Sequence, residues 1–136
     1  MRVVLDTNVL ISALIFPGGA PEFVYRLALE ERIELVTSRT LLAELGSVLE
    51  TKFGWAPARV EQAVSQVARV GVVVEHASTV TEIGADEADN RVLEAAASGG
   101  ASVIVSGDGH LLSLTKWQEI VIVTPADSLK DLASDI

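Results

Sequence analysis

The stretch ASVIVSGDGHLLSL, residues 101–114, contains an apolar run followed by an acid where a strand would end. Residues 101–106 lack apolar/polar alternation, which is typical of a strand covered on both faces. Asp108 follows two positions later, between Gly107 and Gly109. An acid flanked by glycines is ordinarily a turn residue. Asp108 is therefore either a turn residue or part of a functional site, and the other acids decide between the two.

Runs of the same kind recur along the chain and alternate with helical patterns. The predicted strands are residues 2–6, 33–38, 71–75, 101–106 and 119–124. The predicted helices are residues 7–16, 21–32, 39–53, 57–70, 86–100, 110–114 and 126–134. Because helical patterns separate consecutive strands, we expect an α/β fold with a mainly parallel five-stranded sheet and helices on both faces.

The composition indicates one globular domain over residues 1–136, since 49% of the residues are apolar and 21% are charged. No apolar run reaches the roughly 18 residues that span a bilayer, and no signal-peptide pattern opens the chain, so we expect a cytoplasmic protein without membrane contact. The absence of cysteine excludes disulfides and thiolate-bound zinc. The net charge of −9 argues against broad phosphate neutralisation as a way to hold nucleic acid.

Two acids follow predicted strands directly or closely. Asp6 ends the first strand, and Asp108 lies two residues beyond the fourth. Ligands of an open parallel sheet bind outside the carboxyl ends of its strands, and both acids emerge at that edge whatever the strand order. Taken alone, Asp6 is equally well explained as a helix cap and Asp108 as a turn residue.

Further acids lie on helices that start at the same edge. Asp86, Glu87 and Asp89 occupy the first turn of a predicted helix, where the helix dipole favours negative charge. Glu44 lies at the border of the apolar stripe of the helix at 39–53, a position that usually holds a solvated charge. Each acid thus has an ordinary explanation, but together they bring carboxylates from three or four segments to one edge.

Carboxylates packed closely together repel one another unless a cation neutralises them. Oxygen ligands without cysteine and with few histidines favour Mg²⁺ or Mn²⁺ over Zn²⁺. Such ions commonly act on phosphoryl oxygens, so the leading hypothesis is metal-dependent phosphodiester hydrolysis. A phosphoacceptor signalling domain is a poor match, because it needs paired acids at the first strand and a lysine at the fifth. A phosphatase with an aspartate nucleophile needs DxD, and position 8 is asparagine.

Four motifs resemble those of the PIN-domain family, in the family's order and over nearly the whole chain. They are VVLDTNVLISALIFPGG (3–19), SRTLLAELGSVL (38–49), DNRVLEAAASGGASVIVSGDGHLLSL (89–114) and IVIVTPADSL (120–129). Within the family they are similar to small bacterial and archaeal proteins described as toxins of toxin–antitoxin pairs. The resemblance implies a three-layer α/β/α sandwich and Mg²⁺- or Mn²⁺-dependent cleavage of single-stranded RNA.

The resemblance also implies a set of site residues. The family's acidic site corresponds to Asp6, Glu44, Asp89 and Asp108, of which Asp6, Asp89 and Asp108 would hold the metal. In many relatives the third acid directly precedes the basic residue that is Arg91 here. That position is asparagine in this chain, so Asp86 is an alternative to Asp89. The chain also has DEAD where many relatives have DPDD, which leaves one acid fewer for a second metal.

Three other polar residues are candidates for the site. Asn8 and Ser106 match residues that hold the first and last acids in place in the family. His110 is either a phosphate donor or a cap of the short helix at 110–114. Scattered cations could guide RNA, although such cations usually pair with nearby acids; they are Arg39, Lys52, Arg59 and Arg91.

Charge and the resemblance together suggest partners. A basic antitoxin that inserts arginine or lysine into the acidic cleft would suit a chain of net charge −9. The high apolar content predicts a homodimer formed through helix packing. The alternative to a ribonuclease is a catalytically silent interaction module on the same fold, which would bind a protein partner and show no response to divalent ions.

Overall fold

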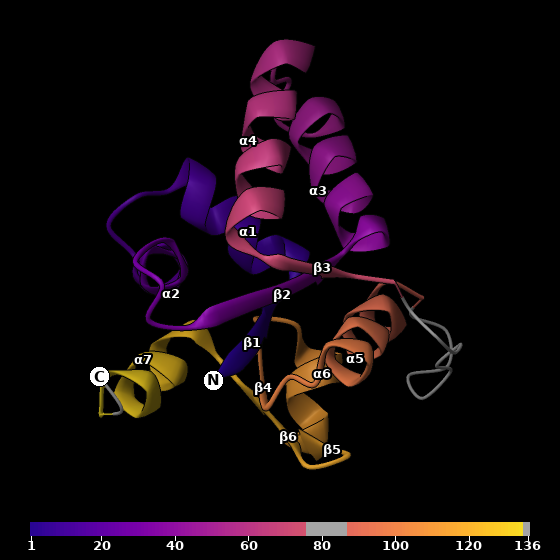
Figure 1. The fold of residues 1–136 in the computed structure, drawn as a ribbon. Helices are drawn as coiled ribbons and strands as arrows, with labels where there is room; N and C mark the ends of the chain where they lie inside the picture. The colour runs from indigo at the N-terminus through magenta and orange to yellow at the C-terminus, as the bar shows by residue number, and fades with distance from the viewer. Residues whose placement is uncertain (76–86, 135–136) are drawn as a thin grey trace.

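The computed structural model describes residues 1–75 and 87–134 (Figure 1). The elements in chain order are β1 (Arg2–Leu5), α1 (Thr7–Ile15), α2 (Ala20–Leu29), β2 (Glu34–Ser38), α3 (Arg39–Thr51), α4 (Pro57–Val70), β3 (Val72–Val74), α5 (Glu87–Gly99), β4 (Val103–Val105), α6 (Gly109–Leu114), β5 (Lys116–Trp117), β6 (Ile120–Val123) and α7 (Pro125–Ser134). They form one sheet in the order β3-β2-β1-β4-β6-β5, in which only β5 runs antiparallel to its neighbour among the described strands. The predicted mainly parallel α/β fold is confirmed.

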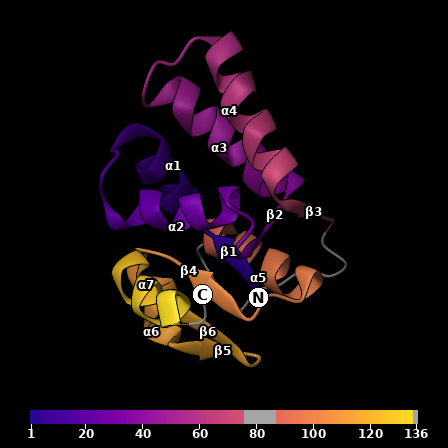
Figure 2. The same ribbon diagram turned by 60° about the vertical axis from the view of Figure 1, so that its left-hand side comes forward.

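Each face of the sheet has its own apolar layer, because successive residues of a strand point to opposite sides. In β1, Val3 and Leu5 pack with α1, α2 and α7, and with parts of α3 and α4. Val4, between them, packs on the other side with α5 and α6. Figures 1 and 2 show these helices on both sides of the strands, which gives the three-layer sandwich.

The predicted count of five strands is wrong by one, because β5 is a two-residue strand without an apolar pattern. It pairs with β6 through a two-residue turn, Gln118–Glu119, in which both residues have positive φ, 48° and 67°. Such turns favour Asn-Gly or Asp-Gly, since other residues pay a steric penalty there. The sequence Gln-Glu therefore gives no hairpin signal.

This turn offers a stabilising substitution. We expect Gln118→Asn combined with Glu119→Gly to raise the free energy of unfolding by about 1 kcal/mol, because both new residues tolerate positive φ. The loss of the exposed ion pair between Lys116 and Glu119, 3.1 Å apart, offsets little of this gain. Thermal melting measures the difference, and an unchanged or lower melting temperature of the double variant would contradict the expected strain.

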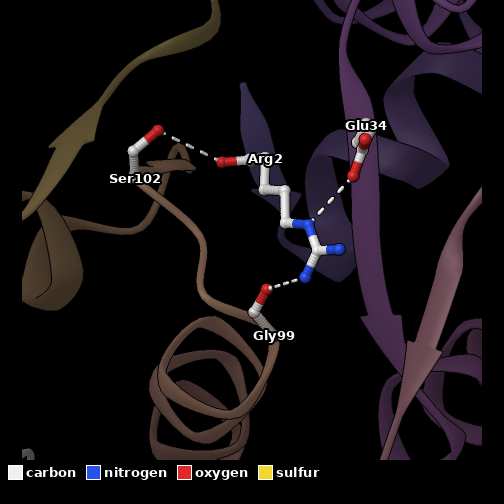
Figure 3. A network of polar contacts seen from close by, with 4 residues as sticks. All are labelled: Arg2, Glu34, Gly99 and Ser102. Atoms are coloured by element: carbon white, nitrogen blue, oxygen red, sulfur yellow. Dashed lines mark hydrogen bonds and ion pairs between the residues drawn. The ribbon is translucent and has the colours of Figure 1, made fainter.

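The amino-terminal edge of the sheet is closed by polar contacts around Arg2 (Figure 3). Its Nε donates to Glu34 Oε2 of β2 at 2.9 Å, and its Nη1 donates to the carbonyl oxygen of Gly99 at the end of α5 at 2.8 Å. The hydroxyl of Ser102 donates to the backbone oxygen of Arg2 at 3.4 Å. Asp6 and Asp108 lie at the opposite, carboxyl-terminal edge.

The helices α3 and α4 pack against each other and project side by side beyond the rest of the fold in both views (Figures 1 and 2). Ser38 caps α3 by accepting a hydrogen bond from the backbone N–H of Leu41 at 3.2 Å. The start of α3 is thereby fixed at the carboxyl end of β2. Among the described residues, no single helix is long and apolar enough to cross a membrane, whereas α1 and α2 meet the criterion only as a pair bent by 96°.

Candidate active site

A pocket of about 210 Å³ opens at the carboxyl-terminal edge of the sheet. Its walls come from the junction of β1 and α1, from the second turn of α3, from the first turns of α5 and from the loop after β4. The lining residues are Asp6, Thr7, Asn8, Glu44, Ala88, Asp89, Val92 and Asp108. The structure thus brings all four sequence-predicted acids to one pocket.

Asp6 is almost completely buried, with 4% of its surface exposed, and both of its carboxylate oxygens are engaged. Oδ1 accepts the backbone N–H of Val9 at 3.0 Å and caps α1, while Oδ2 accepts the hydroxyl of Ser106. Burial raises the pKa of Asp6, and the negative charge of Asp108 raises it further, against the lowering effect of these hydrogen bonds. Asp6 is therefore a helix cap and a pocket residue at once.

Asp108 has the same double position on α6. Its Oδ1 accepts the backbone N–H groups of His110 at 2.8 Å and Leu111 at 3.1 Å. Its own backbone N–H donates to the hydroxyl oxygen of Ser106 at 2.9 Å. Ser106 is fully buried and so connects the side chain of the first acid to the backbone of the last. These contacts fix the direction of both carboxylates. The turn and cap explanations alone do not account for the position of both acids at the pocket.

The two helix acids complete the walls of the pocket. Glu44 is half-buried on α3, so it is not the solvated charge that its border position suggested. Asp89 in the first turns of α5 is buried, and its neighbour Asn90 is buried as well. The alternative ligand, Asp86, lies outside the described residues.

The remaining polar candidates have different positions. Asn8 is exposed and lines the pocket at the start of α1. His110 does not line the pocket; its backbone N–H bonds to Asp108 and the residue is exposed. Thr7, which sequence reasoning did not single out, is buried and lines the pocket. Its position between Asp6 and Asn8 is the only signal that could have identified it.

The cation nearest in sequence to the acids on α5 is not available to guide RNA. Arg91 forms an ion pair with Glu94 at 2.8 Å, and Glu94 is 3% exposed. Buried carboxylates usually have partners of this kind, because an uncompensated charge there is costly. The spacing of three residues on a helix could have predicted this pair.

The donor set of the pocket fits a hard divalent cation. It consists of carboxylates together with amide and hydroxyl oxygens, which Mg²⁺ and Mn²⁺ prefer. In the part of the chain that the structure describes, no three acidic or histidine side chains lie close enough to form a ready-made metal site.

Comparison with known proteins agrees with this architecture. The model of the PIN domain matches residues 2–110. Uncharacterized protein MJ1680 of Methanocaldococcus jannaschii is 35% identical over 118 residues, which are 84% of this chain and 75% of that protein.

Two solved structures share the fold at low sequence identity. PAE2754 from Pyrobaculum aerophilum superposes with a TM-score of 0.65 at 19% identity, over 98% of this chain and 90% of that one. VapBC2 from Rickettsia felis, bound to a DNA fragment from their promoter, gives a TM-score of 0.64 at 13% identity, over 90% of this chain and 97% of that one. With the family match over most of its length, the chain belongs to the PIN domain family.

Proposed function

We propose that the protein is a Mg²⁺- or Mn²⁺-dependent endoribonuclease that hydrolyses phosphodiester bonds of single-stranded RNA. The observation that carries this proposal is the pocket in which Asp6, Glu44, Asp89 and Asp108 meet from four separate segments. The repulsion among these acids is difficult to explain by fold stability, because a neutral Asn or Ser could cap α1 and α6 in place of Asp6 and Asp108. A cation that these acids bind offsets that repulsion.

The contacts of each residue indicate its role in the proposed reaction. Asp6, Asp89 and Asp108 would hold the ion, and Glu44 lines the same pocket from α3. When bound, the ion supplies an activated water and offsets negative charge on the phosphoryl oxygens. Ser106 and the helix N–H groups keep Asp6 and Asp108 oriented, which is a positioning role. The amide of Asn8, exposed at the pocket, would donate to a substrate phosphate.

Divalent-ion binding provides the first test of this proposal. We expect millimolar Mn²⁺ to raise the melting temperature by about 5 °C or more, since a ligand at 100 times its Kd stabilises a protein by about 2.7 kcal/mol. Sodium chloride at the same ionic strength is the control. The same protein should cleave a defined single-stranded RNA in Mn²⁺ and stop when EDTA is added.

The silent interaction module remains the second candidate. It is favoured by the absence, within residues 1–75 and 87–134, of three carboxylates already placed for one ion. The two candidates differ in the melting experiment, because a silent module shows no Mn²⁺-specific shift. A protein that neither shifts nor cleaves would contradict the nuclease proposal.

We also propose that the protein is the toxin of a toxin–antitoxin pair and that a basic segment of the antitoxin occupies the acidic pocket. The net charge of −9 and the acids of the pocket support a cationic partner. Such a segment competes with divalent ions, so Mn²⁺ should weaken the complex more than sodium ions do. The predicted homodimer is supported by exposed apolar side chains directly after α1 and on α2, including Phe16 and Leu29. Light scattering measures whether the protein is a dimer.

A further inference from the structure

Residues 52–59, which are the connection between α3 and α4 and the first turn of α4, form a basic and aromatic end of the projecting pair of helices, here called the hairpin tip. The guanidinium of Arg59 lies 3.8 Å from the centre of the Trp55 ring, which places it in a stacked arrangement. Phe53 is 41% exposed, and Lys52 is exposed beside it. The hairpin tip therefore presents two aromatic rings and two cations.

The cations of the hairpin tip differ from most others in the chain. Seven of the ten lysines and arginines have a carboxylate within 3.9 Å. As far as the described residues show, the other three form no ion pair; they are Lys52, Arg59 and Arg69. Residues 51–60 contain no acid, although the chain has 19, and Glu50 and Glu61 lie directly on either side of this segment. The hairpin tip is thus a local region of positive charge on an acidic protein.

We propose that the hairpin tip binds single-stranded RNA, with bases stacked on its exposed planar groups and phosphates paired with its cations. Arginine planes and aromatic rings are common stacking surfaces for unpaired bases. Trp55 covers one face of the Arg59 guanidinium and so holds it ready for a base on the other. This inference rests on the proposed function in that the bound strand is the nuclease substrate.

The position of the hairpin tip suits a substrate that enters the acidic pocket. Glu44, in the second turn of α3, lines the pocket. The end of α3 leads to the hairpin tip (Figure 1). From Glu44 to Lys52 the helix rises about 12 Å, a distance that a few nucleotides span. Ala43, Ser47 and Thr51 form an exposed uncharged stripe along α3, and the exposed acid Glu50 lies beside its end. A strand that follows this stripe meets cations at the hairpin tip, passes Glu50 and reaches the group of acids at the pocket.

Binding is measured without cleavage in the Asp6→Asn variant with EDTA present, using the fluorescence anisotropy of a labelled 12-nucleotide single-stranded RNA. We expect Arg59→Ala to weaken binding about tenfold and to lower the slope of log Kd against log salt by about 0.7. Arg59→Lys should keep that slope but still weaken binding, because lysine provides the charge without the plane.

Arg26→Ala is the matched control, because it removes the same charge and a similar contact. Arg26 lies 5.4 Å from the Phe23 ring centre, but Glu22 pairs with it at 3.4 Å. We expect its RNA affinity to stay within twofold of the parent protein.

The two tryptophans provide a direct readout of the contact. Trp117→Phe leaves Trp55 as the only tryptophan, and its emission should change when RNA binds. Trp55→Phe leaves Trp117 on β5, whose emission should stay constant.

Equal affinities of the Arg59→Ala and Arg26→Ala variants would overturn the inference, as would a silent Trp55. A change in self-association of Arg59→Ala without a change in RNA affinity would assign the hairpin tip to a second copy instead, and would also overturn it. Loss of RNA binding in Arg59→Ala, in a protein whose wild type shows no Mn²⁺-dependent cleavage, would uphold the hairpin tip and reject the nuclease. Mn²⁺-dependent cleavage that is unaffected by Arg59→Ala would uphold the nuclease and reject the hairpin tip as a binding site for its substrate.

Discussion

Asp6→Asn should reduce Mn²⁺-dependent RNA cleavage at least about 100-fold while the protein remains folded. Asparagine keeps an oxygen that can accept the N–H of Val9, so α1 retains its cap. It lacks the negative charge that holds a divalent ion, and its NH₂ group replaces the oxygen that accepts the Ser106 hydroxyl. The substitution thus separates the helix-capping role of Asp6 from its proposed role in metal binding.

The matched control is Asp127→Asn, which also removes one charge. Asp127 is exposed on α7 and lies 3.9 Å from Lys130, so neither the pocket nor a buried contact is altered. We expect wild-type cleavage from this variant. Equal activity in wild type and Asp6→Asn would show that the cleavage comes from a contaminant or that the pocket is not the site.

Without metal, Asp6→Asn should be more stable than the wild type, although its cleavage activity is lower. Because the pKa of Asp6 is raised in the folded protein from its ordinary value of 3.8, the folded state binds more protons than the unfolded state above that pH. The contribution of Asp6 to stability therefore falls as the pH rises through this range. Thermal melts in EDTA from pH 4 to pH 8 should show a higher melting temperature for Asp6→Asn at neutral pH, with the difference shrinking towards pH 4.

Most of the strands and helices could be predicted because their sequence patterns are set by burial. Strands such as β1 and β4 are covered on both faces, which requires nearly continuous apolar residues. The neighbouring positions of Asp6 and Asp108 followed from parallel pairing alone, and β1 does pair with β4. The order of the remaining strands depends on which helix faces pack together, and no local pattern in the chain encodes it.

The residues of the site were harder to assign because the same side chain serves two purposes. A carboxylate has two oxygens, so Asp108 can cap α6 with one and still face the pocket. The sequence offers the cap and the site residue as alternatives, whereas in the structure Asp108 caps α6 and lines the pocket at once. The burial of Glu44 depends on the packing of α3 against α5, a tertiary contact that a helical wheel does not contain.

Gly99→Ala should lower the free energy of unfolding by about 2–3 kcal/mol, which corresponds to about 7–10 °C in melting temperature. A Cβ at this position would overlap the side chain of Val36, the fully buried residue of β2 on which the end of α5 rests. The backbone cannot easily withdraw, because the carbonyl oxygen of Gly99 accepts a hydrogen bond from Arg2 at 2.8 Å (Figure 3). Val36 and Arg2 thus fix the helix end from two sides.

Gly46→Ala is the matched control, since it also places alanine at a helical glycine. The nearest atoms to its new Cβ, in Val60 and Val64 of α4, are 3.4 Å away, so helix propensity decides the outcome and stability should stay equal or rise. Adding Val36→Ala to Gly99→Ala should restore part of the lost stability relative to the sum of the single changes, because the space removed at one residue is needed by the other. Equal melting temperatures of Gly99→Ala and the wild type would show that this contact does not hold α5 against β2. Simple additivity of the two changes in stability would show the same.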